Sequence, residues 1–177
     1  TAETDADGNF SAPIPEEADY PLQIRASGGI DQVTNNEVET TFEALQEHSG
    51  DGSVTVGPIS TVLTGAAKAK FGDNFEDADN PETVAEFVKN GAATKELAER
   101  LNVPADRDWM NGLPEDTDGR TKVFIAQQVT AETMRRIASQ GVGTGDFGER
   151  VAEAAQGLGA DVADGTLDGQ AEGFATN

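Results

Sequence analysis

Three clusters of acidic residues could do chemistry, because carboxylates at short spacing are the ligands that calcium prefers. In the first cluster, Glu3, Asp5 and Asp7 stand at alternate positions before Gly8. Carboxylates at alternate positions can converge on one cation, and a glycine permits the sharp turn of such a loop. The sequence therefore predicts a calcium site at Glu3, Asp5 and Asp7.

The same segment departs from a complete calcium loop. Aligning Gly8 with the loop glycine puts Ile14, whose side chain has no oxygen, where the bidentate glutamate should stand. Glu16 or Glu17 could complete the coordination instead. The alternative is a hairpin turn in which the aspartate side chains accept hydrogen bonds from the turn amides, and the sequence leaves both interpretations open.

Two further acidic clusters fall in connections between predicted helices. Either could bind Ca²⁺ weakly, although carboxylates also gather in loops and at helix N-termini because water and the helix dipole favour them there. Ca²⁺ is the only cofactor that the sequence suggests. The candidate ligands are Asp73, Asp77 and Asp79, beside Glu76, in the first connection, and Asp116 and Asp118, beside Glu115, in the second.

Other catalytic arrangements find little support in the sequence. His48 is the only histidine and there is no cysteine, so one chain cannot build a metal site from several histidines or from thiolates. No Gly-x-Ser-x-Gly elbow surrounds a serine. The glycine-rich Gly141–Gly145 lacks the Lys-Ser or Lys-Thr of a phosphate loop and is interpreted as a helix stop and hinge. We predict no catalytic residue.

The charge balance is strongly acidic. The 177 residues contain 33 Asp plus Glu and 12 Lys plus Arg, which gives a net charge of −21. Such a chain repels nucleic acid, and it is suited to high salt or divalent cations, which screen its self-repulsion. No apolar run approaches the about 18 residues of a membrane helix. We therefore expect neither nucleic-acid binding nor membrane insertion.

The elements that position these residues change type near Val56. Residues 1–56 alternate strand-forming runs with turn signals such as Asp7-Gly8 and Gly28-Gly29, a pattern typical of antiparallel strands. We interpret them as a β-sandwich-like region. The predicted strands are Asn9–Pro13, Tyr20–Ala26, Val38–Leu45 and Ser53–Val56.

Residues 57–158 predict a helical region with about four to five helices. Pro58 suits the first position of a helix, and Asn80-Pro81 supplies an N-cap followed by a proline at the first helical position. The predicted fold class is α+β, with an N-terminal antiparallel sheet (a partial sandwich) followed by a helix bundle. The predicted helices span 59–71, 81–90, 94–101, 121–139 and 147–158, and 159–177 is a Gly/Asp-rich tail, either flexible or a short strand.

Three segments carry a family resemblance. Thr4–Ser11 and Tyr20–Gly29 resemble the later strands of a carboxypeptidase-regulatory-like, immunoglobulin-like β-sandwich of bacterial surface proteins. Val54–Leu63 is similar to the "T-P-L-T-T-L" segment that opens an acidic helical module in large secreted bacterial and archaeal proteins, with Ile59-Ser60 in place of the usual Leu-Thr. The resemblance implies a non-catalytic surface protein whose earlier strands lie upstream of Thr1 or come from another subunit.

These observations favour a non-catalytic extracellular structural or adhesive protein. We expect a surface layer, fibre or adhesin, assembled by β-strand addition between copies, or with neighbouring domains of a larger surface protein, and helped by Ca²⁺ or high salt. One alternative is an extracellular sugar-binding module, which would need Trp109 and Tyr20 on a common concave surface. Another is a hydrolase that uses two carboxylates, one of them with a raised pKa.

Overall fold

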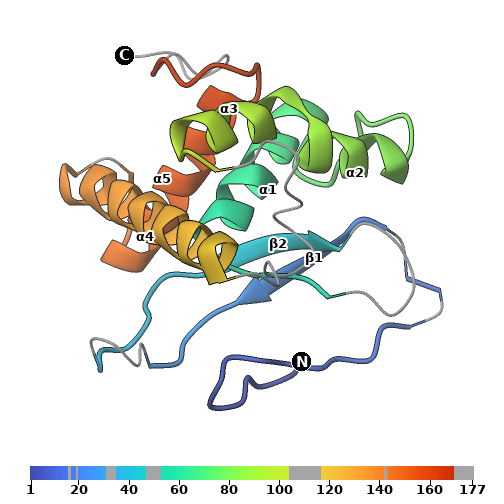
Figure 1. The fold of residues 1–177 in the computed structure, drawn as a ribbon. Helices are drawn as coiled ribbons and strands as arrows, with labels where there is room; N and C mark the ends of the chain where they lie inside the picture. The colour runs from blue at the N-terminus through green and yellow to red at the C-terminus, as the bar shows by residue number, and fades with distance from the viewer. Residues whose placement is uncertain are drawn as a thin grey trace.

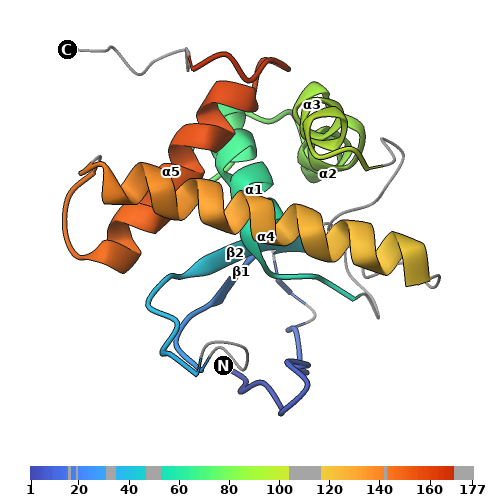
Figure 2. The same ribbon diagram turned by 60° about the vertical axis from the view of Figure 1, so that its left-hand side comes forward.

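The computed structural model describes residues 1–15, 17–18, 20–30, 35–46, 53–103, 117–141 and 143–169. In this part of the chain a two-stranded antiparallel sheet precedes the α-helices, which confirms the predicted α+β class. The sheet lies on one side of the helices in both views (Figure 1, Figure 2). The elements are β1 Leu22–Ala26, β2 Phe42–Gln46, α1 Pro58–Phe71, α2 Pro81–Asn90, α3 Ala92–Arg100, α4 Thr117–Ser139 and α5 Phe147–Val162.

The sheet is smaller than the sequence predicted. β1 and β2 fall within or beside two of the predicted strands and pair antiparallel, with Leu22 opposite Gln46 and Ala26 opposite Phe42. The predicted strands Asn9–Pro13 and Ser53–Val56 are not strands. Proline has no N–H to donate to a ladder, so Pro13 weakens the first of these runs, and the second leads directly into α1.

Local sequence signals account for the starts of three helices, α1, α2 and α5. Pro58 occupies the first turn of α1, as predicted. The Asn80 side chain accepts a hydrogen bond from the Thr83 N–H at 3.0 Å, which confirms the predicted cap of α2. Asp146 and Glu149 form a capping box that starts α5. α4 begins four residues before its predicted start, at Thr117, and α5 continues four residues past its predicted end, to Val162.

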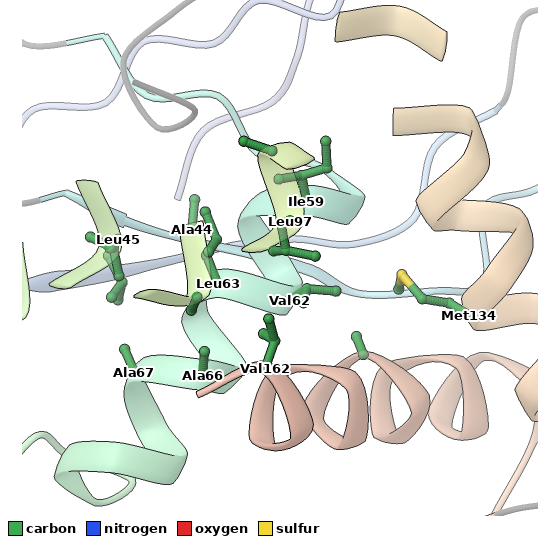
Figure 3. Packing of buried hydrophobic residues seen from close by; sticks show 14 of the residues in the cluster. Ala44, Leu45, Ile59, Val62, Leu63, Ala66, Ala67, Leu97, Met134 and Val162 are labelled. Atoms are coloured by element: carbon green, nitrogen blue, oxygen red, sulfur yellow. The ribbon is translucent and has the colours of Figure 1, made fainter. Parts of the chain in front are cut away.

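Helix α1 lies at the centre of the molecule. It contacts β2 and each of the other four helices of the described chain, and its residues from Ile59 to Ala67 are buried without interruption. Ala44 and Leu45 of β2 join the same cluster of buried side chains as the helices (Figure 3). Because a helix that is buried all round needs neighbours on every side, the sheet and the helices share one core.

A close helix contact joins α1 to α5 through two glycines. A Cβ atom at Gly159 would lie 2.5 Å from the Val62 carbonyl oxygen and 2.5 Å from the Ala66 nitrogen. A Cβ atom at Gly65 would lie 3.1 Å from the Gln156 Cα. The two backbones therefore touch without intervening side chains, and α5 cannot approach α1 this closely with a larger residue at Gly159.

We predict that Gly159→Ala destabilises the fold by about 2 kcal/mol, because overpacking forces the two backbones apart. Gly157→Ala is the matched control: it lies in the same helix, and its added Cβ would meet no atom within 4 Å. It should stabilise the protein by about 0.5–1 kcal/mol through its higher helix propensity. Urea unfolding monitored by circular dichroism measures both values, and equal effects of the two substitutions would contradict the packing argument.

Candidate functional site

The backbone of β1 forms a sheet edge that no described strand covers. The Glu43 N–H donates to Thr61 Oγ1 at 2.9 Å, and Ser60 Oγ donates to the Glu43 carbonyl at 2.8 Å. These backbone groups of Glu43 point away from β1, so Arg25 and Glu43 are a non-hydrogen-bonded pair of the ladder. The N–H and C=O of Arg25, and of Gln23 two residues before it, therefore point away from β2. We call these four backbone groups the β1 edge.

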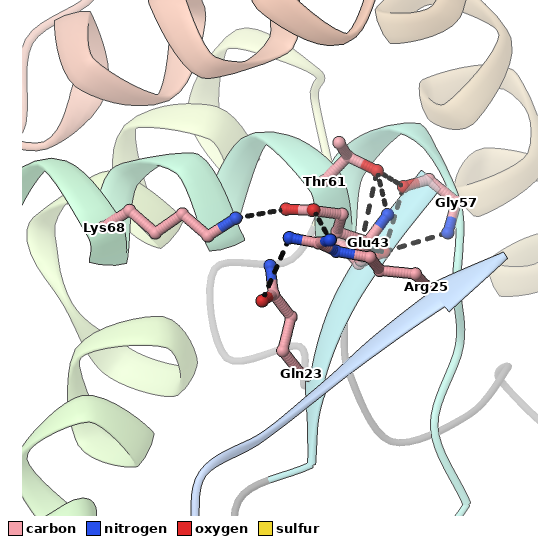
Figure 4. Close-up of polar contacts among 7 residues, drawn as sticks. Gln23, Arg25, Glu43, Gly57, Thr61 and Lys68 are labelled. Atoms are coloured by element: carbon pink, nitrogen blue, oxygen red, sulfur yellow. Dashed lines mark hydrogen bonds and ion pairs between the residues drawn. The ribbon is translucent and has the colours of Figure 1, made fainter. Parts of the chain in front are cut away.

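The opposite edge, on β2, is closed by the first turn of α1 (Figure 4). Ser60 Oγ also accepts the Gly57 N–H at 2.9 Å, and Thr61 Oγ1 also donates to the Gly57 carbonyl at 2.7 Å. Each hydroxyl thus bonds both to the strand and to the chain that enters the helix. The sheet is left with one edge bonded to α1, while the β1 edge has no backbone partner among the described residues.

An ion-pair cluster fixes β1 against α1. The Glu43 carboxylate bonds to Lys68 Nζ at 2.6 Å and to Arg25 Nε at 2.9 Å (Figure 4). Glu43 and Lys68 are each 12% exposed, whereas Arg25 is 62% exposed. Charge-assisted hydrogen bonds are stronger where water is excluded. The cluster therefore holds β1, β2 and α1 in one orientation while leaving the Arg25 side chain accessible beside the β1 edge.

We predict that Ser60→Ala lowers the free energy of unfolding by about 1–3 kcal/mol, because the Gly57 N–H would lose its side-chain acceptor and the Glu43 carbonyl its closest donor. Thr133→Ala serves as the control, since its exposed hydroxyl bonds only to the Val129 carbonyl of its own helix, and it should change the value by no more than about 0.5 kcal/mol. Urea unfolding gives both numbers. Indistinguishable midpoints for the two variants would show that the Ser60 hydroxyl does not hold the strand.

The N-terminal acidic cluster forms a turn. Asp5 Oδ1 accepts the N–H of Asp7 and the N–H of Asn9, each at 2.9 Å. The hydrogen bond from the Asn9 backbone is the main cause that lowers the Asp5 pKa, helped by the Asn9 side chain. Glu3 and Asp7 are exposed. This geometry favours the turn interpretation of the segment over the calcium loop.

Of the other two acidic clusters, the structure describes the one between α1 and α2 and only Asp118 of the other. Asp73, Asp77 and Asp79 lie in the connection between α1 and α2, where the Asp77 N–H donates to the Phe71 carbonyl at 3.0 Å. Asp118 lies in the first turn of α4. No group of three or more histidine or carboxylate side chains in the described ranges could hold a metal ion. Asp116, Glu16, His48 and Trp109 lie outside the described residues.

Apolar surface is exposed along α4. Phe124 is 60% exposed, Ile125 54% and Val129 50%. Val129 also borders a cavity of about 70 Å³ between α1, α3, α4 and α5. The cavity is smaller than the roughly 300–1,000 Å³ of a typical ligand pocket. Its lining residues are Val62, Leu97, Arg100, Leu101, Val129, Thr130, Thr133, Leu158 and Leu167.

A carboxylate on α3 holds the segment that follows α5. Glu96 Oε1 bonds to Arg100 Nε at 2.8 Å and accepts the Leu167 N–H at 3.3 Å. The hydrogen bond from Arg100 is the main cause that lowers the Glu96 pKa, and the Leu167 amide adds to it. Leu167 thereby packs against the core, in a region that the sequence predicted as a flexible tail or a short strand.

We predict that acid releases this segment. A carboxyl group whose pKa is lowered by folding stabilises the structure above its ordinary pKa, and this contribution disappears as the pH falls through the lowered value. The Leu167 amide signal in NMR spectra should therefore titrate with a midpoint below that of an ordinary glutamate. Glu96→Gln should abolish the transition. A midpoint at or above the ordinary value would contradict the assignment.

Sequence reasoning missed the two hydroxyls that close the β2 edge. The sequence signal that could have found them is the pair Ser60-Thr61, which falls in the first turn of a helix. That helix follows Gly57-Pro58, and its N-cap residue Gly57 has no side chain.

Among the described residues no helix has the length and apolar character needed to cross a membrane. Comparisons with protein-family models, with curated proteins and with solved structures found no match.

Proposed function

We propose that this chain is a non-catalytic structural protein that works outside the cell, where copies assemble into a layer or fibre by strand addition. The observation that carries the proposal is the β1 edge, whose outward backbone groups on Gln23 and Arg25 have no backbone partner among the described residues. An unpaired edge is a template for another strand. Here one edge of the sheet is closed by α1 and the other is open, so each copy accepts one strand.

The net charge sets the conditions for assembly. At −21, like charges on two copies oppose their association. The screening length falls from about 10 Å at 0.1 M salt to about 3 Å at 1 M, and Ca²⁺ bound loosely to surface carboxylates lowers the charge directly. Assembly should therefore need high salt or Ca²⁺. The exposed apolar side chains of α4 provide additional contact surface between copies.

The two alternatives draw less support. A hydrolase of the two-carboxylate type needs an acid with a raised pKa. The shifted pKa values among the described carboxyl groups, those of Asp5, Glu96, Glu132 and Asp164, all lie below the ordinary values. For a sugar-binding module, the predicted contact residue Trp109 lies outside the described residues. The cavity beside α4 offers such a module little, because it is small and its walls are mostly apolar.

We predict that wild-type protein forms species larger than its 18.5 kDa monomer in molar NaCl or with CaCl₂, and that Arg25→Pro prevents this. Proline at position 25 removes one of the two outward N–H groups of the β1 edge without touching the bonds between β1 and β2. Arg25→Ala is the matched control, because it loses the same ion pair with Glu43 but keeps the N–H. Light scattering and sedimentation velocity measure the size, with a chelator added to one calcium sample.

The outcomes separate assembly from simple solubility effects. Association of wild type and of Arg25→Ala, together with monomeric Arg25→Pro, supports strand addition at the β1 edge. Equal association of all three proteins would place the contact elsewhere. A wild-type protein that stays monomeric in low salt, molar NaCl and CaCl₂ would sink the proposal.

A further inference from the structure

The segment before β1 has the features of a strand without a sheet. Residues 1–15 are exposed throughout, and Phe10 and Ile14 keep 36% and 39% of their surface in contact with solvent. Apolar residues alternate at Phe10, Ala12 and Ile14, so in an extended conformation their side chains share one face. The segment Phe10–Ile14 is five residues long, as β1 is. It could therefore cover the whole β1 edge.

Proline positions give the two sides of this segment different hydrogen-bonding capacity. In an extended strand, the backbone groups of alternate residues point to the same side. Phe10, Ala12 and Ile14 have N–H groups for one side, while Pro13 and Pro15 have none for the other. One side of the segment can pair fully with a neighbouring strand, and the other side is blocked against a further strand.

We infer that the strand added at the β1 edge is the segment Phe10–Ile14 of a second copy, which pairs through the N–H and C=O groups of Phe10, Ala12 and Ile14. This inference rests on the proposed function and names its donor. The open β1 edge needs a strand with N–H groups on its pairing side. The side of the segment that includes Ala12 meets this requirement, and the proline side then ends the sheet.

The pairing also places the apolar side chains. In an antiparallel arrangement, two residues whose N–H and C=O groups bond to each other stand directly opposite across the ladder. Their side chains lie on the same face of the sheet. Ala12 then stands opposite Gln23 or Arg25. The side chains of Phe10, Ala12 and Ile14 fall on the sheet face that carries the Glu43–Lys68 pair, next to α1. Two solvent-exposed apolar groups would thus be covered at each junction.

The arrangement is open-ended. The donor segment and the β1 edge are different surfaces of the same chain, so each copy donates to one neighbour and accepts from another. Such head-to-tail contacts build a filament unless the rotation between copies closes a ring. Each junction would contain three strands: the donor, β1 and β2.

Two proline substitutions in the full chain test the donor. Ala12→Pro removes an N–H from the pairing side, and Ser11→Pro removes one from the other side. We expect Ala12→Pro to raise the protein concentration at half-assembly about tenfold or more, and Ser11→Pro to leave it within about twofold of wild type. Both positions are exposed, so the urea unfolding midpoint of each variant should equal that of wild type.

Mixing identifies the two surfaces directly. Ala12→Pro has an impaired donor and an intact edge, whereas Arg25→Pro has an intact donor and a blocked edge. Each should be monomeric alone at a concentration where wild type assembles. Their equimolar mixture should give a one-to-one dimer and no larger species in sedimentation velocity, because only one type of junction can form.

Other results would overturn the inference. If wild type assembles and Arg25→Pro does not, but Ala12→Pro assembles normally, another segment is the donor and the proposed function still stands. If Ser11→Pro and Ala12→Pro impair assembly equally, the two-sided hydrogen-bond argument is wrong. If wild type stays monomeric in every condition, the donor and the proposed function fail together.

Discussion

The close contact between α1 and α5 is the constraint on which the rest of the structure depends. From Ile59 to Ala67, α1 is buried all round, and a buried helix needs partners that approach on every side. The chain has 36% hydrophobic residues and few aromatics, so large side chains cannot fill wide gaps between helices. Gly65 and Gly159 bring the backbones together instead. The core is densely packed because these helices lie close together, rather than because large side chains fill the space between them.

The position of α1 then determines which sheet edge is open. Its first turn lies beside β2, where Ser60 and Thr61 bond to the backbone of Glu43. Gln127 of α4 accepts the Ile59 N–H at 3.0 Å and so supplies the cap that Gly57 lacks. The first turn of α1 is thereby bonded both to the sheet and to α4. Since α1 occupies the β2 side, only β1 can accept another strand within the described part of the sheet.

Local rules in the sequence predicted the parts of this fold that depend on local chemistry. Pro58 and the Asn80-Pro81 pair placed two helix starts correctly, because caps and first-turn prolines act within a few residues. Strand pairing depends on distant partners, and the predicted strand at Asn9–Pro13 pairs with no described strand. The bonds from Ser60 and Thr61 to Glu43 span 17 and 18 residues, which no local pattern specifies.

The candidate site was less predictable still, for the same physical reason. Composition gives the amount of charge but not its arrangement. The Asp5 carboxylate, for example, accepts hydrogen bonds from the backbone N–H groups of Asp7 and Asn9 in a turn. The β1 edge carries no residue type that marks it, because backbone groups make it. The register, with Arg25 opposite Glu43, and the bonds of the Glu43 backbone to α1 together reveal which N–H and C=O groups point outward.

In the proposed assembly, two features oppose uncontrolled association. One is permanent, and the other depends on the salt concentration. Pro13 and Pro15 lack N–H groups under all conditions, so they limit sideways growth of the sheet permanently. The net charge of −21 opposes contact only while it is unscreened. Salt or Ca²⁺ therefore permits junctions to form without removing the limit on their width. A chain protected in both ways would stay dispersed in dilute solution and grow along one axis where cations are abundant.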